Sequence, residues 1–150
     1  MDLLYQLQML LPLAIKWAEE HSEKIQNEGT PLTAEEIKLA KQVGVTNPEK
    51  VKILEVAEIP MPENEELNEA AVQIGFLNES MTGLTLGHSI YICNGQNTTR
   101  LLSHELRHVY QYETFGSISE FLIEYLKQIV FVGYENSILE QDARNHEIFI

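Results

Sequence analysis

The segment HELRH, residues 104–108, has the residue types and the spacing needed to bind a divalent metal. In a helix, His104 and His108 lie one turn apart on the same face, so their imidazoles can hold one zinc ion. Glu105 then stands beside the first ligand, where it can take a proton from zinc-activated water during attack on a carbonyl. The alternative interpretation is two histidines on a partly exposed helix, with Glu105 contacting His108.

A catalytic zinc ion usually has three protein ligands and water, so a further ligand must lie elsewhere in the chain. The residues after His108 read VYQYETFG and offer no further histidine, which leaves a later helix as the source. The candidates there are Glu124, Glu135, Glu140, Asp142 and His146. Glu140 suits a chain that returns to the motif helix after one intervening helix. However, Ser137 and Glu140 also form a capping-box pattern, and the local sequence does not decide between these two interpretations.

The N-terminal part of the chain, residues 1–45, predicts two helices. Apolar residues recur at helical spacing over residues 3–18, and the pattern continues to Gly29, where a long amphipathic helix should stop. Pro12 should start or kink that helix. A capping box over residues 33–36 predicts a second, short helix that ends near Gly44.

The middle part, residues 51–93, predicts a small sheet with one helix. VKILEVAEI, residues 51–59, reads as a strand with Val51, Ile53 and Val56 as core positions, and NEELNEAAVQIGF reads as a helix. GLTLGHSIYIC, residues 83–93, is rich in β-formers around a glycine, which predicts an edge strand or a bent hairpin.

An edge strand in that segment can pair with an extended peptide. Gly87, His88 and Ser89 are therefore predicted to contact a peptide substrate. His88 is not predicted to bind the metal, because no ligand spacing includes it.

The last part, residues 98–150, predicts three helices that carry the metal ligands. The motif helix should end at Gly116, the next should run from Ser117 to Gly133, and the last should follow Ser137. The whole chain is therefore expected to form a single α+β domain, mainly helical with a small β-sheet. Its parts are 1–45, 51–93 and 98–150.

Composition and charge limit the classes of partner. The chain of 150 residues holds 23 acidic and 10 basic side chains, a net charge of −13, which argues against nucleic acid and anionic membranes. Cys93 is the single cysteine, which excludes an internal disulfide and fits a reducing compartment. Asp2 replaces the positive charge of a secretory signal, and the apolar start is too short and interrupted to span a membrane. A cytoplasmic protein is expected.

The stretches HELRHVYQYETFG, FLIEYL and GYENSILEQDAR resemble the small gluzincin-like metalloproteins, over roughly residues 80–144. These include bacterial domains related to the core domain found with extracellular contractile injection systems. The resemblance implies a zincin-like fold. It also implies Glu140 as the third ligand, since gluzincins carry this glutamate in E-x-x-A or E-x-x-S and Ala143 completes the match. Larger gluzincins often have an acidic residue where this chain has Arg144, so the partner that orients a ligand histidine is open.

The leading hypothesis is a small zinc-dependent metallopeptidase with one zinc ion per chain, held by His104, His108 and Glu140. Glu105 activates the water, and Tyr134, in the loop before the last helix, is a candidate donor to the oxyanion or else packs under its loop. The partner is then a peptide or protein substrate. The alternatives are a non-catalytic zinc-binding interaction or assembly module, and a protein without metal. The same ligands also accept manganese, cobalt, nickel or iron.

Overall fold

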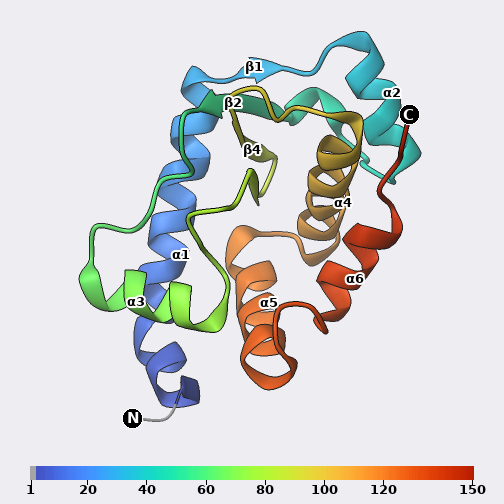
Figure 1. Ribbon diagram of the computed structural model, residues 1–150. Helices are drawn as coiled ribbons and strands as arrows, with labels where there is room; N and C mark the ends of the chain where they lie inside the picture. Colours follow the sequence, from blue (N-terminus) through green and yellow to red (C-terminus); the bar gives the residue numbers. More distant parts are fainter. Residues whose placement is uncertain (1–2) are drawn as a thin grey trace.

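A small mixed sheet lies between two groups of helices (Figure 1). The computed structural model describes residues 3–150. Its helices are α1 Leu3–Glu28, α2 Ala34–Gln42, the 3-10 helix η1 Pro48–Lys50, α3 Glu65–Ile74, α4 Thr99–Phe115, α5 Ile118–Val132 and α6 Ile138–Asn145. Its strands are β1 Thr30–Pro31, β2 Lys52–Val56, β3 Gly83–Leu86 and β4 Ser89–Cys93. Over residues 3–150, none of the helices is both long and apolar enough to cross a membrane.

The strand order is β1-β2-β4-β3, in which β2 and β4 run parallel and the other pairs are antiparallel. The hairpin between β3 and β4 turns at Gly87, whose φ of 72° is a left-handed conformation that favours glycine. The expectation of a bent hairpin is therefore confirmed, and β3 is an edge strand of the described sheet.

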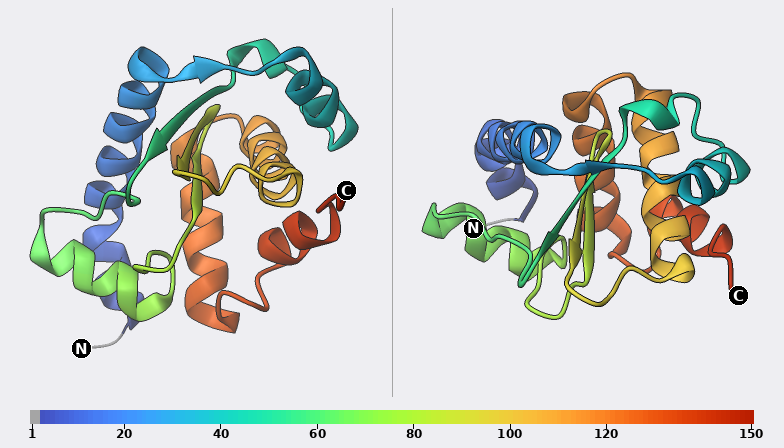
Figure 2. Two further views of the ribbon diagram at one scale, coloured as in Figure 1. Left: turned by 45° about the horizontal axis from the view of Figure 1, so that its top comes forward. Right: turned by 90° about the horizontal axis from the view of Figure 1, so that it is seen from above.

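Each face of the sheet carries its own hydrophobic cluster, because side chains alternate along a strand. Leu84 and Tyr91 face the first cluster, which α1, α3 and α5 complete. Ile53 and Ile90 face the second, which α2 and α4 complete. Figure 2 shows the sheet between α1 on one side and α4 on the other.

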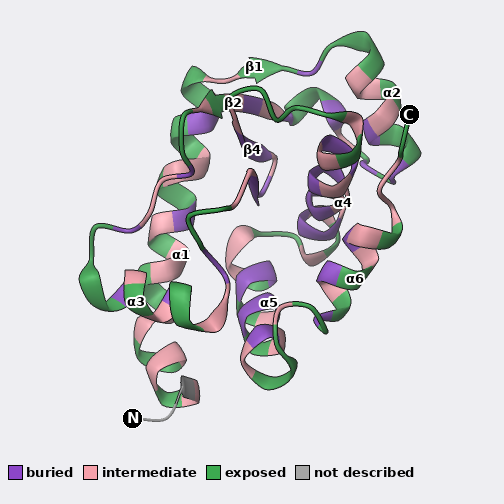
Figure 3. Cartoon of the chain, in the orientation of Figure 1, coloured by how far each residue is buried: buried purple, intermediate pink, exposed green. Residues whose placement is uncertain are grey.

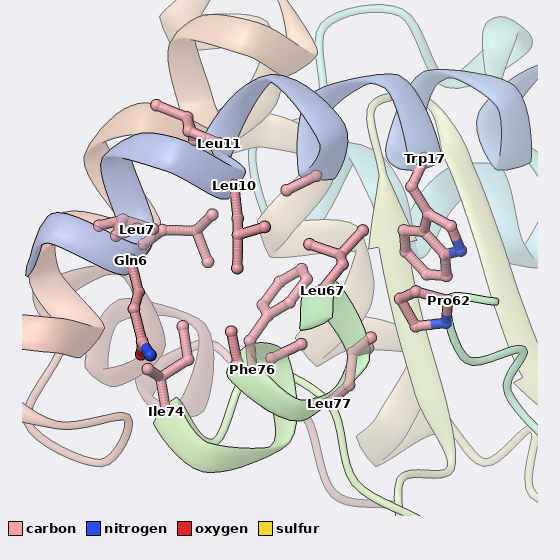
Figure 4. A pocket seen from close by; sticks show the side chains of 14 residues that line it. Gln6, Leu7, Leu10, Leu11, Trp17, Pro62, Leu67, Ile74, Phe76 and Leu77 are labelled. Carbon is pink, nitrogen blue, oxygen red and sulfur yellow. The ribbon is translucent and has the colours of Figure 1, made fainter. Parts of the chain in front are cut away.

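The apolar stripe of α1 packs against α3 and the chain before it. In Figure 4, Leu7 and Leu10 of α1 point toward the space beside Leu67 of α3, and the ring of Trp17 lies against Pro62. This arrangement confirms the predicted amphipathic helix. Pro12 lies inside α1, so it does not start the helix.

Helix α4 is the most deeply placed helix of the fold, as the share of buried residues along it shows (Figure 3). The side chain of Thr98 accepts a hydrogen bond from the backbone N–H of Leu101, and Gly116 ends the helix with a φ of 95°. Leu102, Leu106 and Val109 pack on the sheet at helical spacing. Both histidines of the motif lie on this firmly held helix.

The fold is α+β, mainly helical with a small sheet, as the sequence predicts. The strand expected over residues 51–59 is shorter and ends at Val56. Val51 and Ile53 are buried as expected, whereas Val56 is half-buried. Its carbonyl accepts a hydrogen bond from the backbone N–H of Asn94, just beyond the end of β4.

Replacing Leu106 with alanine should lower the free energy of unfolding by about 2–5 kcal/mol, because the side chain is fully buried between α4 and the sheet. Leu101→Ala is the matched control, since Leu101 lies on the same helix but is only half-buried. Urea denaturation of both variants measures the difference. Equal losses of unfolding free energy in the two variants would show that burial of Leu106 against the sheet does not stabilise the fold more than the half-buried Leu101 does.

Candidate metal centre

Helices α4 and α6 bring two imidazoles and one carboxylate to a single point. His104 Nε2 lies 3.2 Å from Glu140 Oε1, and His108 Nε2 lies 3.0 Å from Glu140 Oε2. The ligand atoms of the three side chains all lie within 4.8 Å of one another. Two histidines and a glutamate with this convergence are a donor set that zinc uses in catalytic sites.

The surroundings of Glu140 fit a bound cation. The residue is 1% exposed, and a buried carboxylate is strongly unfavourable unless it is paired. Tyr125 donates a hydrogen bond to Oε2 at 2.6 Å. Within residues 3–150, Oε1 receives no hydrogen bond that satisfies distance and angle, although His104 Nε2 is nearby. This buried oxygen is therefore available as a ligand.

The structure also separates the two interpretations of Glu140. Ser137 does cap α6, since its hydroxyl accepts from the backbone N–H of Glu140 at 3.4 Å. The carboxylate of Glu140, however, points toward the two histidines. Ser137 therefore caps α6, and the side chain of Glu140 belongs to the histidine cluster.

Charge within the cluster shifts the pKa values of its members. Burial opposes the charged form of His104, but the close contact with the Glu140 carboxylate and the charge of Glu105 outweigh it and raise the pKa to about 9. Burial likewise opposes ionisation of Glu140, but the close contacts with both histidines hold its pKa well below the usual range. Without a metal, His104 therefore favours its protonated form beside the buried carboxylate at neutral pH.

The second ring nitrogen of each histidine has its own partner. His104 Nδ1 lies 2.8 Å from Glu147 Oε2, and His108 Nδ1 lies 2.8 Å from Gln111 Oε1. Asp142 does not reach either histidine, but its carboxylate accepts a hydrogen bond from Gln111 Nε2 at 2.9 Å. Such partners leave Nε2 free to face a metal. Glu147 was not predicted from the sequence, because no local spacing links it to the motif.

Glu105 lies at the same site and is 5% exposed. Thr85 of β3 donates a hydrogen bond to its Oε1 at 2.7 Å. Strand β3 passes so close that a Cβ on Gly83 would lie 3.1 Å from Glu105 Oε2. The sheet edge therefore fixes one carboxylate oxygen of Glu105, and Gly83 places no side chain against the other.

Aromatic rings enclose the cluster. The rings are contributed by Phe76, Tyr112, Phe121, Tyr125 and Tyr134. Burial and the charges of Glu140 and Glu105 raise the pKa of Tyr134, so its hydroxyl stays protonated and can donate. Tyr134 lines the pocket around the cluster and also packs against the first hydrophobic cluster, so its role as a donor stays a prediction. No sequence pattern singles out Tyr125 as a partner of Glu140, because helical spacing does not show which way a hydroxyl points.

The hairpin residues Gly87, His88 and Ser89 do not reach this cluster. They line a separate hollow at the turn of the hairpin, where His88 Nε2 lies 2.9 Å from Glu113 Oε2. The prediction placed the candidate site at the wrong part of the hairpin. The residues beside Glu105 are Gly83 and Thr85, because the hairpin register carries β3 along α4.

No family model matches the chain, and neither a curated protein nor a solved structure matches it. The resemblance to gluzincin-like metalloproteins therefore stays a prediction. The case for a metal centre rests on the geometry of His104, His108 and Glu140.

Zinc binding should release about one proton per ion at pH 7, because the metal must displace the proton that His104, with its pKa raised to about 9, holds in the metal-free cluster. The affinity should rise as the pH increases toward 9, where His104 loses its proton unaided. Isothermal titration calorimetry in two buffers of different ionisation enthalpy measures the release. Binding without proton release would contradict the protonated cluster.

Proposed function

We propose that the protein is a zinc-dependent metallopeptidase in which His104, His108 and Glu140 hold the metal. The convergence of both Nε2 atoms on the buried carboxylate of Glu140 carries this proposal. When bound, zinc supplies Lewis acidity, which lowers the pKa of water to roughly 7 and polarises a carbonyl.

Glu105 acts as the general base. Its Oε1 already accepts a hydrogen bond from Thr85, so Oε2 is the atom that takes the proton from water. The same carboxylate later gives the proton to the leaving amine. Thr85 holds the carboxylate in one orientation between these two steps. Tyr134 donates from its neutral hydroxyl to the oxyanion that forms on the carbonyl.

The number of protein ligands favours catalysis. Structural zinc sites generally have four protein ligands, whereas catalytic sites keep a position for water or substrate. Within residues 3–150, the cluster brings three ligands together. A purely structural zinc site would also have no use for Glu105 beside the first histidine.

A non-catalytic zinc-binding module is the second candidate, and the enclosure of the site favours it. His108 is 6% exposed and Glu105 5% exposed. Tyr112 donates a hydrogen bond to the carbonyl of Thr85, so this group of the edge strand is not free for a peptide. A module that only binds zinc needs no path for a substrate to the metal.

Glu105→Gln should retain about one zinc ion per chain but lower peptide hydrolysis about 10²–10⁴-fold, because the amide cannot accept the proton from water. Metal analysis and turnover of a peptide library measure the two effects. Glu19→Gln is the matched control, since it makes the same charge change at an exposed position of α1.

Three outcomes of this experiment decide between the candidates. Hydrolysis that survives in Glu105→Gln would exclude the general-base role. A parent protein that binds zinc and hydrolyses no peptide would support the binding module. Purified protein that binds no metal would exclude both candidates and leave the histidines structural.

Gly83→Ala should lower turnover about 10–100-fold with zinc still bound, because the new methyl group would push against Glu105 and displace its carboxylate. The clash is tight, at 3.1 Å to Oε2 and 3.2 Å to Cγ. Gly83 does not have a positive φ, so alanine brings no backbone strain there, and the parent protein is the direct comparison. Unchanged turnover in Gly83→Ala would show that the position of Glu105 against β3 does not matter.

A further inference from the structure

We propose that Glu147 is a positioning residue for the ligand His104, and that the segment after α6, residues 146–150, thereby controls how tightly the metal is held. The inference rests on the proposed metal centre. It concerns metal retention and does not depend on peptide hydrolysis.

The first support is the hydrogen bonding of His104. Its Nε2 faces Glu140, and its Nδ1 lies 2.8 Å from Glu147 Oε2. When Nε2 binds a metal, Nδ1 keeps its proton and needs an acceptor. Glu147 meets that need with a side chain that is 13% exposed. Its second oxygen lies 3.4 Å from Arg100 Nη1, so the carboxylate is held from both sides.

The second support is the anchoring of the chain around Glu147. The backbone N–H of Ile148 donates to Ser103 Oγ at 2.8 Å, and this hydroxyl donates to the carbonyl of Arg100 at 2.9 Å. Ser103 is fully buried, and Ile148 packs against the hydrophobic cluster between the sheet and α4. The segment after α6 is thus fastened to the helix that carries both histidines.

The third support is the difference between the two ligand histidines. His108 Nδ1 faces the neutral amide oxygen of Gln111, from the next turn of its own helix. His104 Nδ1 faces a carboxylate from a distant part of the chain. A charged acceptor makes a stronger hydrogen bond and raises the basicity of the ligand. The affinity contributed by His104 therefore depends on where the segment after α6 lies.

Competition titration with a chromophoric zinc chelator tests the inference on the full chain. Glu147→Ala should weaken zinc binding about 10–100-fold, because Nδ1 loses its acceptor. Glu147→Gln should recover part of the loss, since its amide oxygen gives His104 the kind of partner that His108 already has. In the cobalt-substituted protein, both variants should shift the visible absorption bands, which report the ligand environment.

Two controls separate positioning from charge and from anchoring. Glu19→Gln removes the same negative charge at an exposed site on α1 and should leave the zinc affinity unchanged. Ser103→Ala removes one anchor of the segment but leaves Glu147 and its contact with Arg100 in place, so it should weaken zinc binding less than Glu147→Ala does. Melting temperatures of the metal-free variants show whether a loss of zinc affinity arises from unfolding. If Glu147→Ala unfolds, the zinc affinity of Glu147→Gln decides whether Glu147 is a positioning residue.

The failures are distinguishable. A parent protein that binds no zinc overturns the proposed metal centre and this inference with it. Zinc binding in the parent that is unchanged in Glu147→Ala overturns the inference alone. A loss in Ser103→Ala as large as that in Glu147→Ala also overturns the positioning role, because Glu147 would then only help to hold the segment.

Discussion

The burial of one carboxylate, that of Glu140, constrains the whole C-terminal half of the fold. At 1% exposure this group needs positive charge and donors around it, and α4 and α5 supply them through His104, His108 and Tyr125. In α6 itself, Ile138–Asn145, the buried residues are Glu140 and Ala143. Leu139 packs against the first hydrophobic cluster, and polar contacts with α4 and α5 hold the rest of this helix in place.

A network of polar side chains extends that constraint outward. Arg107 forms two hydrogen bonds with Asp142, and Gln111 bonds both to that carboxylate and to the carbonyl of Leu139. The same Gln111 holds His108, so the contacts that fix α6 also orient a ligand ring. A shift of α6 would therefore also change the geometry of the cluster formed by His104, His108 and Glu140. Such coupling suits a metal centre, where small displacements weaken binding.

The features that the sequence predicts well are local. Helix ends are marked by Thr33, Ser117 and Gly116 within one turn of the residues they affect, and the structure places the ends there. The shared face of the two histidines follows from helical geometry alone. The resemblance, rather than local spacing, pointed to Glu140, because a capping box gives the same pattern.

The features that the sequence could not show depend on how distant segments meet. Glu147 reaches His104 across 43 positions, and Thr85 reaches Glu105 across 20. Neither sequence separation belongs to a known motif, so neither contact can be recognised from the sequence. The hairpin was recognised, but only its register against α4 decides that Thr85, and not His88, lies beside the motif. An alternating strand pattern does not contain that information.

The side chains that cover the cluster lie mainly on connections between helices and strands. This location bears on which of the two candidate functions the enclosure favours. Phe76 and Met81 lie on the connection between α3 and β3, and Tyr134 lies on the connection between α5 and α6. The ligands and Glu105 lie on helices. Side chains on connections can move without disturbing the geometry of the three side chains in the cluster, so burial of the cluster is compatible with substrate entry. Low exposure strengthens electrostatic interactions at the metal, which benefits a hydrolase once its substrate is in place. The cover over the cluster is therefore weaker evidence about function than the position of Glu105.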